Sequence, residues 1–282
     1  MDLRIVDTHV HVASQDSVRY PRVSRTATAA WYERGDADVT HLLAAMDRCG
    51  VDAAVLVQAH GPYRDDNRYC ADARALAPHR LASVSIVDVT RADCVERLEH
   101  WADRGMAGTR LVHLPPVEPP WLADRATEPL WRRAAALGLR VNVCTVRRYL
   151  PLVEQLLTWA PRVPIALDHS ALVDLGAAVD AAAYDEVCAL ARHEHVHLKI
   201  SPHVLAYAST RGQTAAELVR DLAGVFGADR LMWSSDWPNA GHSYEQLVRD
   251  GVESAALLTD ADRARYLGGT ARTLWPELTG TR

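Results

Sequence analysis

Four residues from three separate parts of the chain have side chains that can bind a metal ion or transfer a proton. His9 and His11 stand two residues apart near the start of the chain, His169 lies further along and Asp236 lies near the end. Two imidazoles on one face can chelate one metal ion or together polarise one carbonyl group. A carboxylate beside them can take a proton from water. Each motif alone is a weak signal, so the prediction depends on all four residues meeting in space.

The elements that must bring these residues together are short apolar runs, which alternate with segments of helical period. Strands are expected at residues 4–9, 53–59, 81–87, 108–113, 139–145, 164–169, 196–201 and 231–236. Helices are expected at residues 40–49 with Thr40 as the N-cap, at 66–77, 92–104, 128–137, 149–160, 182–192 and 214–226, and after the eighth strand. Eight repeats of strand then helix predict an α/β protein with a (β/α)8 TIM barrel, formed as a single domain over residues 1–282. A doubly wound sheet would usually carry a glycine fingerprint after its first strand, where this chain has His-Val-His.

In a barrel of this kind, active sites lie at the mouth formed by the C-terminal ends of the strands. His9 and His11 fall at the end of the first expected strand, where period two places them on the same inward face. His169 and Asp236 end the sixth and eighth expected strands, so the barrel predicts that all four meet. Residues 13–39 are the longest irregular stretch, and we expect them to form a lid over a ligand.

The composition argues against several other classes of protein. The chain is mildly acidic, with a formal charge of −5 and scattered arginines, so it lacks the basic face that nucleic-acid binding needs. It has no run of about 18 apolar residues, which predicts no membrane span, and its first residues lack the apolar core of a signal peptide. The 5 cysteines are widely spread without a C-x-x-C pair, which argues against a disulfide framework or structural zinc site and favours the cytoplasm.

Taken together, these motifs resemble the amidohydrolase superfamily, and within it the amidohydrolase-2 branch that contains sugar lactonases and 2-pyrone-4,6-dicarboxylate lactonase. The matching stretches are DTHVH at 7–11, YP at 20–21, VQA at 57–59, DNR at 66–68, GTRL at 108–111, DH at 168–169, KIS at 199–201, SSDWP at 234–238 and YLGGTA at 266–271. The resemblance covers essentially the whole chain. It implies that His9, His11, His169 and Asp236 form the catalytic group, with Asp236 as the general base toward water.

The resemblance leaves the metal content of the site open. Superfamily members with two metals use a bridging lysine or acidic residue around strand four or five, and many with one metal add a histidine on strand five. Here the fifth expected strand reads VNVCT without a histidine, and the fourth ends in His113 without a lysine, so we expect no binuclear centre. Two alternatives stay open, a metal-free site and one divalent ion, with zinc as the first choice. The expected ligands of such an ion are His9, His11, Asp236 and His169.

Arg110 is the main candidate for substrate binding. It stands in the middle of a strand at a position that faces the mouth, where a guanidinium needs an anionic partner. We expect it to bind a carboxylate or ring oxygen of the substrate, and the alternative is an internal ion pair with Asp7 or Asp168. The further candidates for substrate binding are Tyr20, Asn67, Asn142 and Ser201, together with His60 and His203.

The predicted function is hydrolysis of the lactone ring of a sugar acid or of a carboxylated ring-cleavage intermediate. The expected partner is therefore an anionic small molecule, and the sequence leaves a homo-oligomer open. One alternative is a single-metal, non-oxidative decarboxylase of a related branch, against which the missing histidine of the fifth strand argues. The other is a barrel that binds a small molecule without turnover. Lys199, the only lysine, lies in the seventh expected strand, where we expect a structural ion pair.

Overall fold

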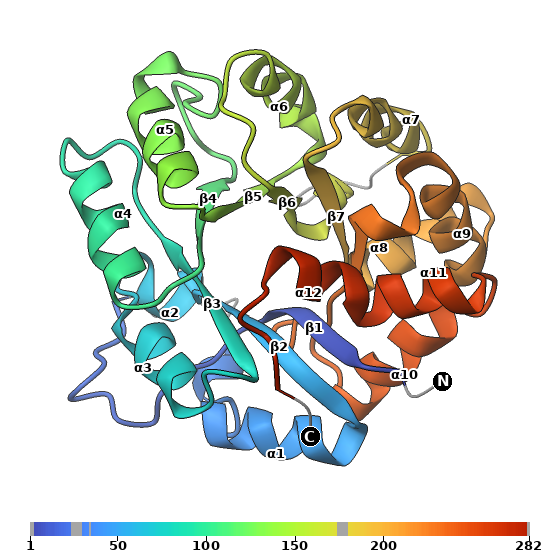
Figure 1. Ribbon diagram of the computed structural model, residues 1–282, viewed down its shortest axis with the longest axis horizontal. Coiled ribbons are helices and arrows are strands. Elements are labelled where there is room, and N and C mark those ends of the chain that lie inside the picture. Colours follow the sequence, from blue (N-terminus) through green and yellow to red (C-terminus); the bar gives the residue numbers. More distant parts are fainter. Residues whose placement is uncertain (1–2, 24–29, 34, 174–179, 281–282) are drawn as a thin grey trace.

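The computed structural model describes residues 3–23, 30–33, 35–173 and 180–280. Eight parallel strands follow one another around the molecule in chain order, each hydrogen-bonded to the next (Figure 1). They are β1 Ile5–Val10, β2 Val51–Val57, β3 Leu81–Ile86, β4 Gly108–His113, β5 Arg140–Thr145, β6 Ile165–Leu167, β7 Val196–Ile200 and β8 Leu231–Trp233. The predicted eight-stranded barrel is confirmed. Residues 24–29 and 34 of the expected lid lie outside the described residues.

Helices connect the strands and surround the barrel (Figure 1). They are α1 Val39–Cys49, α2 His60–Tyr63, α3 Arg68–Leu76, α4 Cys94–Asp103, α5 Glu128–Ala136, α6 Leu150–Leu157, α7 Ala183–Ala189, α8 Pro202–Tyr207, α9 Ala215–Phe226, α10 Tyr244–Ser254, α11 Asp260–Ala264 and α12 Thr270–Leu274. The N-cap of α1 is Asp38, whose carboxylate accepts from the main-chain N–H of His41, so the prediction of Thr40 was wrong. Among the described residues, no helix has the length and apolarity needed to cross a membrane.

The apolar residues form two separate cores. The larger one lies between the strands and the surrounding helices. The smaller one fills the inside of the barrel toward the N-terminal ends of the strands. There Val6, Ala53 and Met232 pack against Leu274 and Trp275. Helix α12 lies across this end of the barrel in Figure 1. Apolar side chains therefore fill the barrel interior toward the N-terminal ends of the strands, and the opposite end is where barrels of this kind carry their active sites.

The barrel closes between β1 and the segment that follows β8. The main-chain N–H of His11 donates to the carbonyl oxygen of Trp237 at 2.8 Å, and that of Asp236 donates to His9 at 2.9 Å. The carboxylate Oδ1 of Asp7 accepts from the main-chain N–H of Ser235 at 2.9 Å. These bonds join the DTHVH stretch directly to the SSDWP stretch.

Candidate active site

His9 and His11 point their rings toward one another at the mouth. Their Nε2 atoms are 3.2 Å apart. Nδ1 of His11 lies 2.8 Å from the carbonyl oxygen of Val57, and Nδ1 of His9 lies 3.3 Å from the carboxylate Oδ1 of Asp168. Both of these oxygens can accept from a protonated Nδ1, and Nδ1 of His9 also lies 3.4 Å from Nζ of Lys199. In the tautomers that carry the proton on Nδ1, the two Nε2 lone pairs face each other.

Asp236 supplies a third electron pair at the same point. Its Oδ1 lies 3.4 Å from Nε2 of His11 and 3.8 Å from Nε2 of His9, and within the described residues it has no hydrogen-bond donor. Its Oδ2 accepts from the Nδ2 of Asn239 at 3.0 Å and lies 3.5 Å from Nε2 of His203. The residue has a φ of 52°, a left-handed conformation that costs energy for a non-glycine residue and is often found at functional sites.

The three side chains have the donor set of a metal site. One ligand atom from each of His9, His11 and Asp236 lies within 4.8 Å of the others, and all three residues are buried. Three lone pairs that converge without a proton repel one another unless a cation or proton lies between them. Each imidazole also holds its other ring nitrogen on a fixed oxygen, as metal-bound histidines do. These residues fit a divalent ion.

Asp168 is the central residue of a buried network of ion pairs and hydrogen bonds beneath this cluster. Its Oδ2 accepts from Nε of Arg110 at 2.7 Å, and its Oδ1 lies 3.1 Å from Nζ of Lys199 and 3.3 Å from Nδ2 of Asn142. Burial acts to raise the pKa of Asp168, but the charges of Lys199, His9 and Arg110 outweigh it and hold that pKa well below its usual range. The carboxylate stays ionised and fixes the orientation of the His9 ring.

Two residues that were singled out in the sequence, Lys199 and Arg110, belong to this network. Lys199 has no exposed surface and forms an ion pair with Asp168, which is the structural ion pair expected for it. Arg110 also pairs with Asp168 and donates from Nη2 to Sγ of Cys144 at 3.2 Å. This is the geometry of the alternative given for Arg110, an internal ion pair. A role for Arg110 toward substrate stays a prediction.

His169 and Ser201 lie beside the cluster. His169 has a φ of 52°, its Nδ1 is 2.9 Å from the Oγ of Ser201, and its ring centroid is 5.0 Å from that of His9. Burial lowers the pKa of His169 to about 4, so its ring is neutral at pH 7. Its nitrogens are not part of the compact His9, His11 and Asp236 group. We therefore assign it to the wall of the site.

Tyr20 and Asn67 are placed differently from the other candidates. The hydroxyl of Tyr20 donates to the carboxylate of Asp72 on α3 at 2.7 Å. Asn67 exchanges two hydrogen bonds with the main chain of Ile86, at 2.7 and 2.9 Å, and so holds the β2–α3 connection against the end of β3. Both side chains are engaged within the scaffold. Their expected binding of substrate stays a prediction.

Sequence reasoning missed two residues at the mouth. Asp168 was considered only as a partner for Arg110, although it directly precedes His169 in the sequence. The ring of Trp31 stacks on that of His11, with centroids 6.1 Å apart and planes inclined by 23°. The first could have been found from its position at a strand end. The second depends on how the long loop after β1 folds back.

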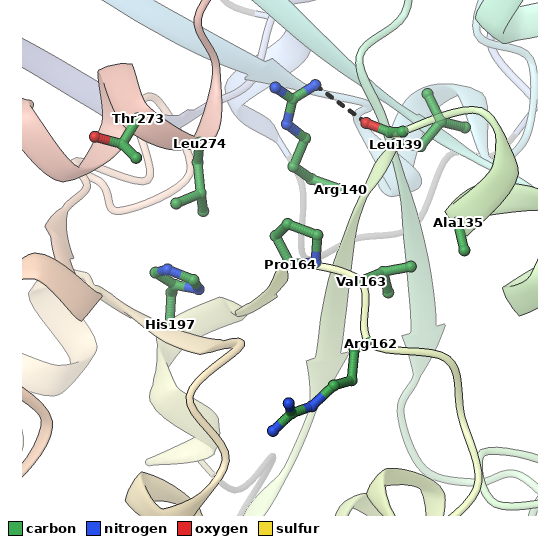
Figure 2. Close-up of a pocket in the computed structure, with 10 residues that line it drawn as sticks. Ala135, Leu139, Arg140, Arg162, Val163, Pro164, His197, Thr273 and Leu274 are labelled. Carbon is green, nitrogen blue, oxygen red and sulfur yellow. Dashed lines mark hydrogen bonds between the residues drawn. The ribbon is translucent and has the colours of Figure 1, made fainter.

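The cavity shown in Figure 2 lies at the opposite end of the barrel. It has a volume of about 450 Å³ and is lined by Arg140, Arg162, Pro164 and His197, together with Leu274 of α12. Arg140 and His197 stand at the N-terminal ends of β5 and β7. A smaller cavity, of about 160 Å³, lies near the mouth beside α2. Of these two cavities, the smaller one is near the candidate catalytic residues.

A closed barrel of parallel strands with a buried His-His-Asp cluster at its mouth is the architecture of an amidohydrolase-type barrel enzyme. The family model described as Amidohydrolase matches residues 6–276. The chain therefore belongs to the amidohydrolase family, and the predicted resemblance is confirmed.

Named relatives agree with this assignment. The chain is 30% identical over 277 residues to the L-fucono-1,5-lactonase of Burkholderia ambifaria, which covers 94% of this chain and 93% of that protein. Its structure is similar to that of a probable 2-pyrone-4,6-dicarboxylic acid hydrolase from Acinetobacter baumannii, with a TM-score of 0.79, 20% identity, and coverage of 98% of this chain and 100% of that one. It is also similar to an amidohydrolase from Burkholderia multivorans solved with bound zinc, with a TM-score of 0.74, 23% identity, and coverage of 97% and 99%.

Proposed function

We propose that this enzyme opens a lactone ring by hydrolysis. The observation that carries the proposal is the Oδ1 of Asp236, a buried carboxylate oxygen without a hydrogen-bond donor among the described residues, beside two imidazole lone pairs. Two proteins similar to this chain are named for the hydrolysis of cyclic esters, and one of them is 30% identical over nearly its full length. A carboxylate base next to a cation-binding centre suits attack of water on an ester carbonyl.

In the proposed reaction Asp236 takes a proton from water as the water oxygen adds to the lactone carbonyl carbon. The carbon–oxygen bond of the ring then breaks, and the proton held by Asp236 passes to the leaving ring oxygen. Burial acts to raise the pKa of Asp236, but charge and hydrogen bonding from the surrounding histidines, among them His203 at 3.5 Å from Oδ2, outweigh burial and hold that pKa well below its usual range. The residue is therefore a carboxylate at neutral pH, as a general base must be.

We further propose that one divalent ion binds to His9, His11 and Asp236. Zinc is our first choice because two imidazoles and one carboxylate are a ligand set that zinc takes in catalytic sites. When bound there, such an ion supplies Lewis-acid stabilisation of the developing oxyanion and lowers the pKa of a bound water. His169 and Ser201 line the same mouth and are proposed to orient the substrate.

A panel of lactones, followed by proton release with and without a chelator, tests the function. We expect turnover of at least one lactone and a loss of about 100-fold or more in kcat for Asp236→Asn, because that change removes the base. Undiminished turnover by Asp236→Asn would contradict the assigned base. A protein that retains zinc, hydrolyses no lactone and decarboxylates an aromatic acid would instead be the alternative enzyme.

A further inference from the structure

The cavity of about 160 Å³ belongs to the same mouth as the proposed catalytic group. Its lining residues come from the C-terminal ends of three neighbouring strands, β2, β3 and β4, and from the segments that follow them. Among them are Ile86, which pairs with Arg110 in the register of β3 and β4, and Val112, which lies two residues beyond Arg110 on the same face of its strand. The cavity therefore lies above the buried network, on the β2–β4 side of the mouth.

The wall formed by α2 is held rigidly in place. The buried side chain of Gln58 donates from Nε2 to the carbonyl oxygens of Arg64 at 3.2 Å and Asp66 at 2.8 Å. Arg64 has a φ of 48°, in the left-handed region that non-glycine residues rarely adopt. Asn67 ties the next turn to Ile86. A strained residue kept in place by buried hydrogen bonds indicates a preformed wall.

The polar groups of the cavity offer both donors and acceptors. Arg64 is exposed, and among the described residues its guanidinium has no carboxylate within ion-pair distance. Oδ1 of Asp88 accepts from the main-chain N–H and the hydroxyl of Thr90, and within the described part of the chain Oδ2 has no hydrogen-bond donor. Burial and the charges of Arg110 and Arg64 lower the pKa of His60 to about 4, so its ring is neutral.

The remaining lining favours a ring that carries hydroxyl groups. The half-buried indole of Trp121 gives the cavity an apolar surface, which packs on the C–H groups of such a ring. Because Asp65 is already paired with Arg97 at 2.8 Å, an anionic substituent would meet the carboxylate of Asp88 as well as the cation of Arg64. Hydroxyl groups can donate to the carboxylate and accept from the guanidinium without net repulsion.

We propose that this cavity binds the hydroxyl groups of the substrate, with Arg64 and Asp88 as residues that determine specificity for sugar lactones over unsubstituted or anionic ones. The inference rests on the proposed lactone hydrolysis and specifies its substrate class. It also explains how a substrate is held when Arg110 is occupied by Asp168. The relative named L-fucono-1,5-lactonase agrees in substrate class.

The test compares three six-membered lactones: a hydroxylated hexono-1,5-lactone, δ-valerolactone without hydroxyl groups, and a carboxylated 2-pyrone. For Arg64→Met and Asp88→Asn we expect kcat/KM for the hexonolactone to fall by about 10- to 100-fold, mostly through KM, with δ-valerolactone hydrolysis unchanged. Arg162→Met is the matched control, since Arg162 lines the cavity at the opposite end of the barrel (Figure 2). It should leave every substrate unaffected.

Equal losses on the hexonolactone and δ-valerolactone, or a loss confined to the carboxylated substrate, would overturn the inference while leaving lactone hydrolysis intact. Absence of all lactone turnover in the wild-type enzyme would overturn the proposed function instead. Binding of a non-hydrolysable hexonolactam, measured by calorimetry, then still tests the cavity. Weaker binding by the Arg64→Met variant supports it, and unchanged binding contradicts it.

Discussion

The main-chain N–H of Asp236 donates to the carbonyl oxygen of His9 at 2.9 Å, and the carboxylate of the same aspartate faces the ring of the same histidine, with Oδ1 3.8 Å from Nε2. The two residues are 227 positions apart in the sequence, yet one main-chain bond sets the distance between their side chains. The proposed base is therefore aligned with the imidazole by the closure of the barrel itself. Small errors in such alignment are costly in catalysis.

The first prediction concerns metal content. His11→Ala removes one of three proposed ligands, and we expect it to lose most of the bound zinc that the wild-type protein carries at about one ion per chain. His193→Ala is the control, because His193 lies at the other end of the barrel and pairs with Glu154. Elemental analysis of both purified variants decides the matter. Wild-type zinc content in His11→Ala would place the ion elsewhere.

The second prediction separates structure from catalysis at Lys199. Lys199→Met leaves Asp168 buried with one cation fewer, so the free energy of unfolding should fall by about 3 kcal/mol. Turnover per folded molecule should persist, because Lys199 lies beneath His9 and has no exposed surface. Urea denaturation and kinetics measure the two effects. If Lys199→Met stays stable but loses turnover, the lysine acts in the reaction.

The third prediction concerns Arg110. Arg110→Met should lower stability, because it removes a guanidinium that is paired with a buried carboxylate. We expect kcat/KM for anionic and neutral lactones to change by the same factor, since the guanidinium is engaged by Asp168 and Cys144. A selective loss with anionic lactones would show that Arg110 also binds substrate.

The fourth prediction compares two glycines. A Cβ on Gly268 would lie 1.9 Å from the carbonyl oxygen of Arg4, so Gly268→Ala should destabilise the protein by about 1–3 kcal/mol. Gly224, in α9, has nothing within 4 Å of such a Cβ, so Gly224→Ala should stabilise the protein by about 1 kcal/mol. Thermal or urea unfolding of both variants tests the pair. Similar effects of the two substitutions would contradict the close packing at Gly268.

Much of the fold could be predicted because parallel strands buried on both faces are continuous apolar runs, and the helices between them end at glycines such as Gly50. One error at a strand end is instructive. The sixth strand was expected to run to residue 169, but β6 ends at Leu167 because His169 and Ser170 turn into the left-handed region. No pattern in the neighbouring sequence predicts this backbone conformation, because the surrounding structure maintains it.

The candidate site was predictable to the extent that it depends on strand ends. Period two and the barrel placed His9, His11 and Asp236 together. The polar partners were less predictable, because a side chain such as Asn67 can hydrogen-bond to substrate or to the scaffold. Only the folded arrangement shows that its partner is the main chain of Ile86.

The packing of α12 and the segment after it against the first strands affects how the chain folds while it is being synthesised. Val6 and Ala53 are buried against residues that lie more than 200 positions later in the chain, Leu274 and Trp275. On the ribosome the first strands emerge long before those residues have been made. Their inner faces stay exposed until Leu274 and Trp275 have been made, a period in which chaperone binding and aggregation compete with folding.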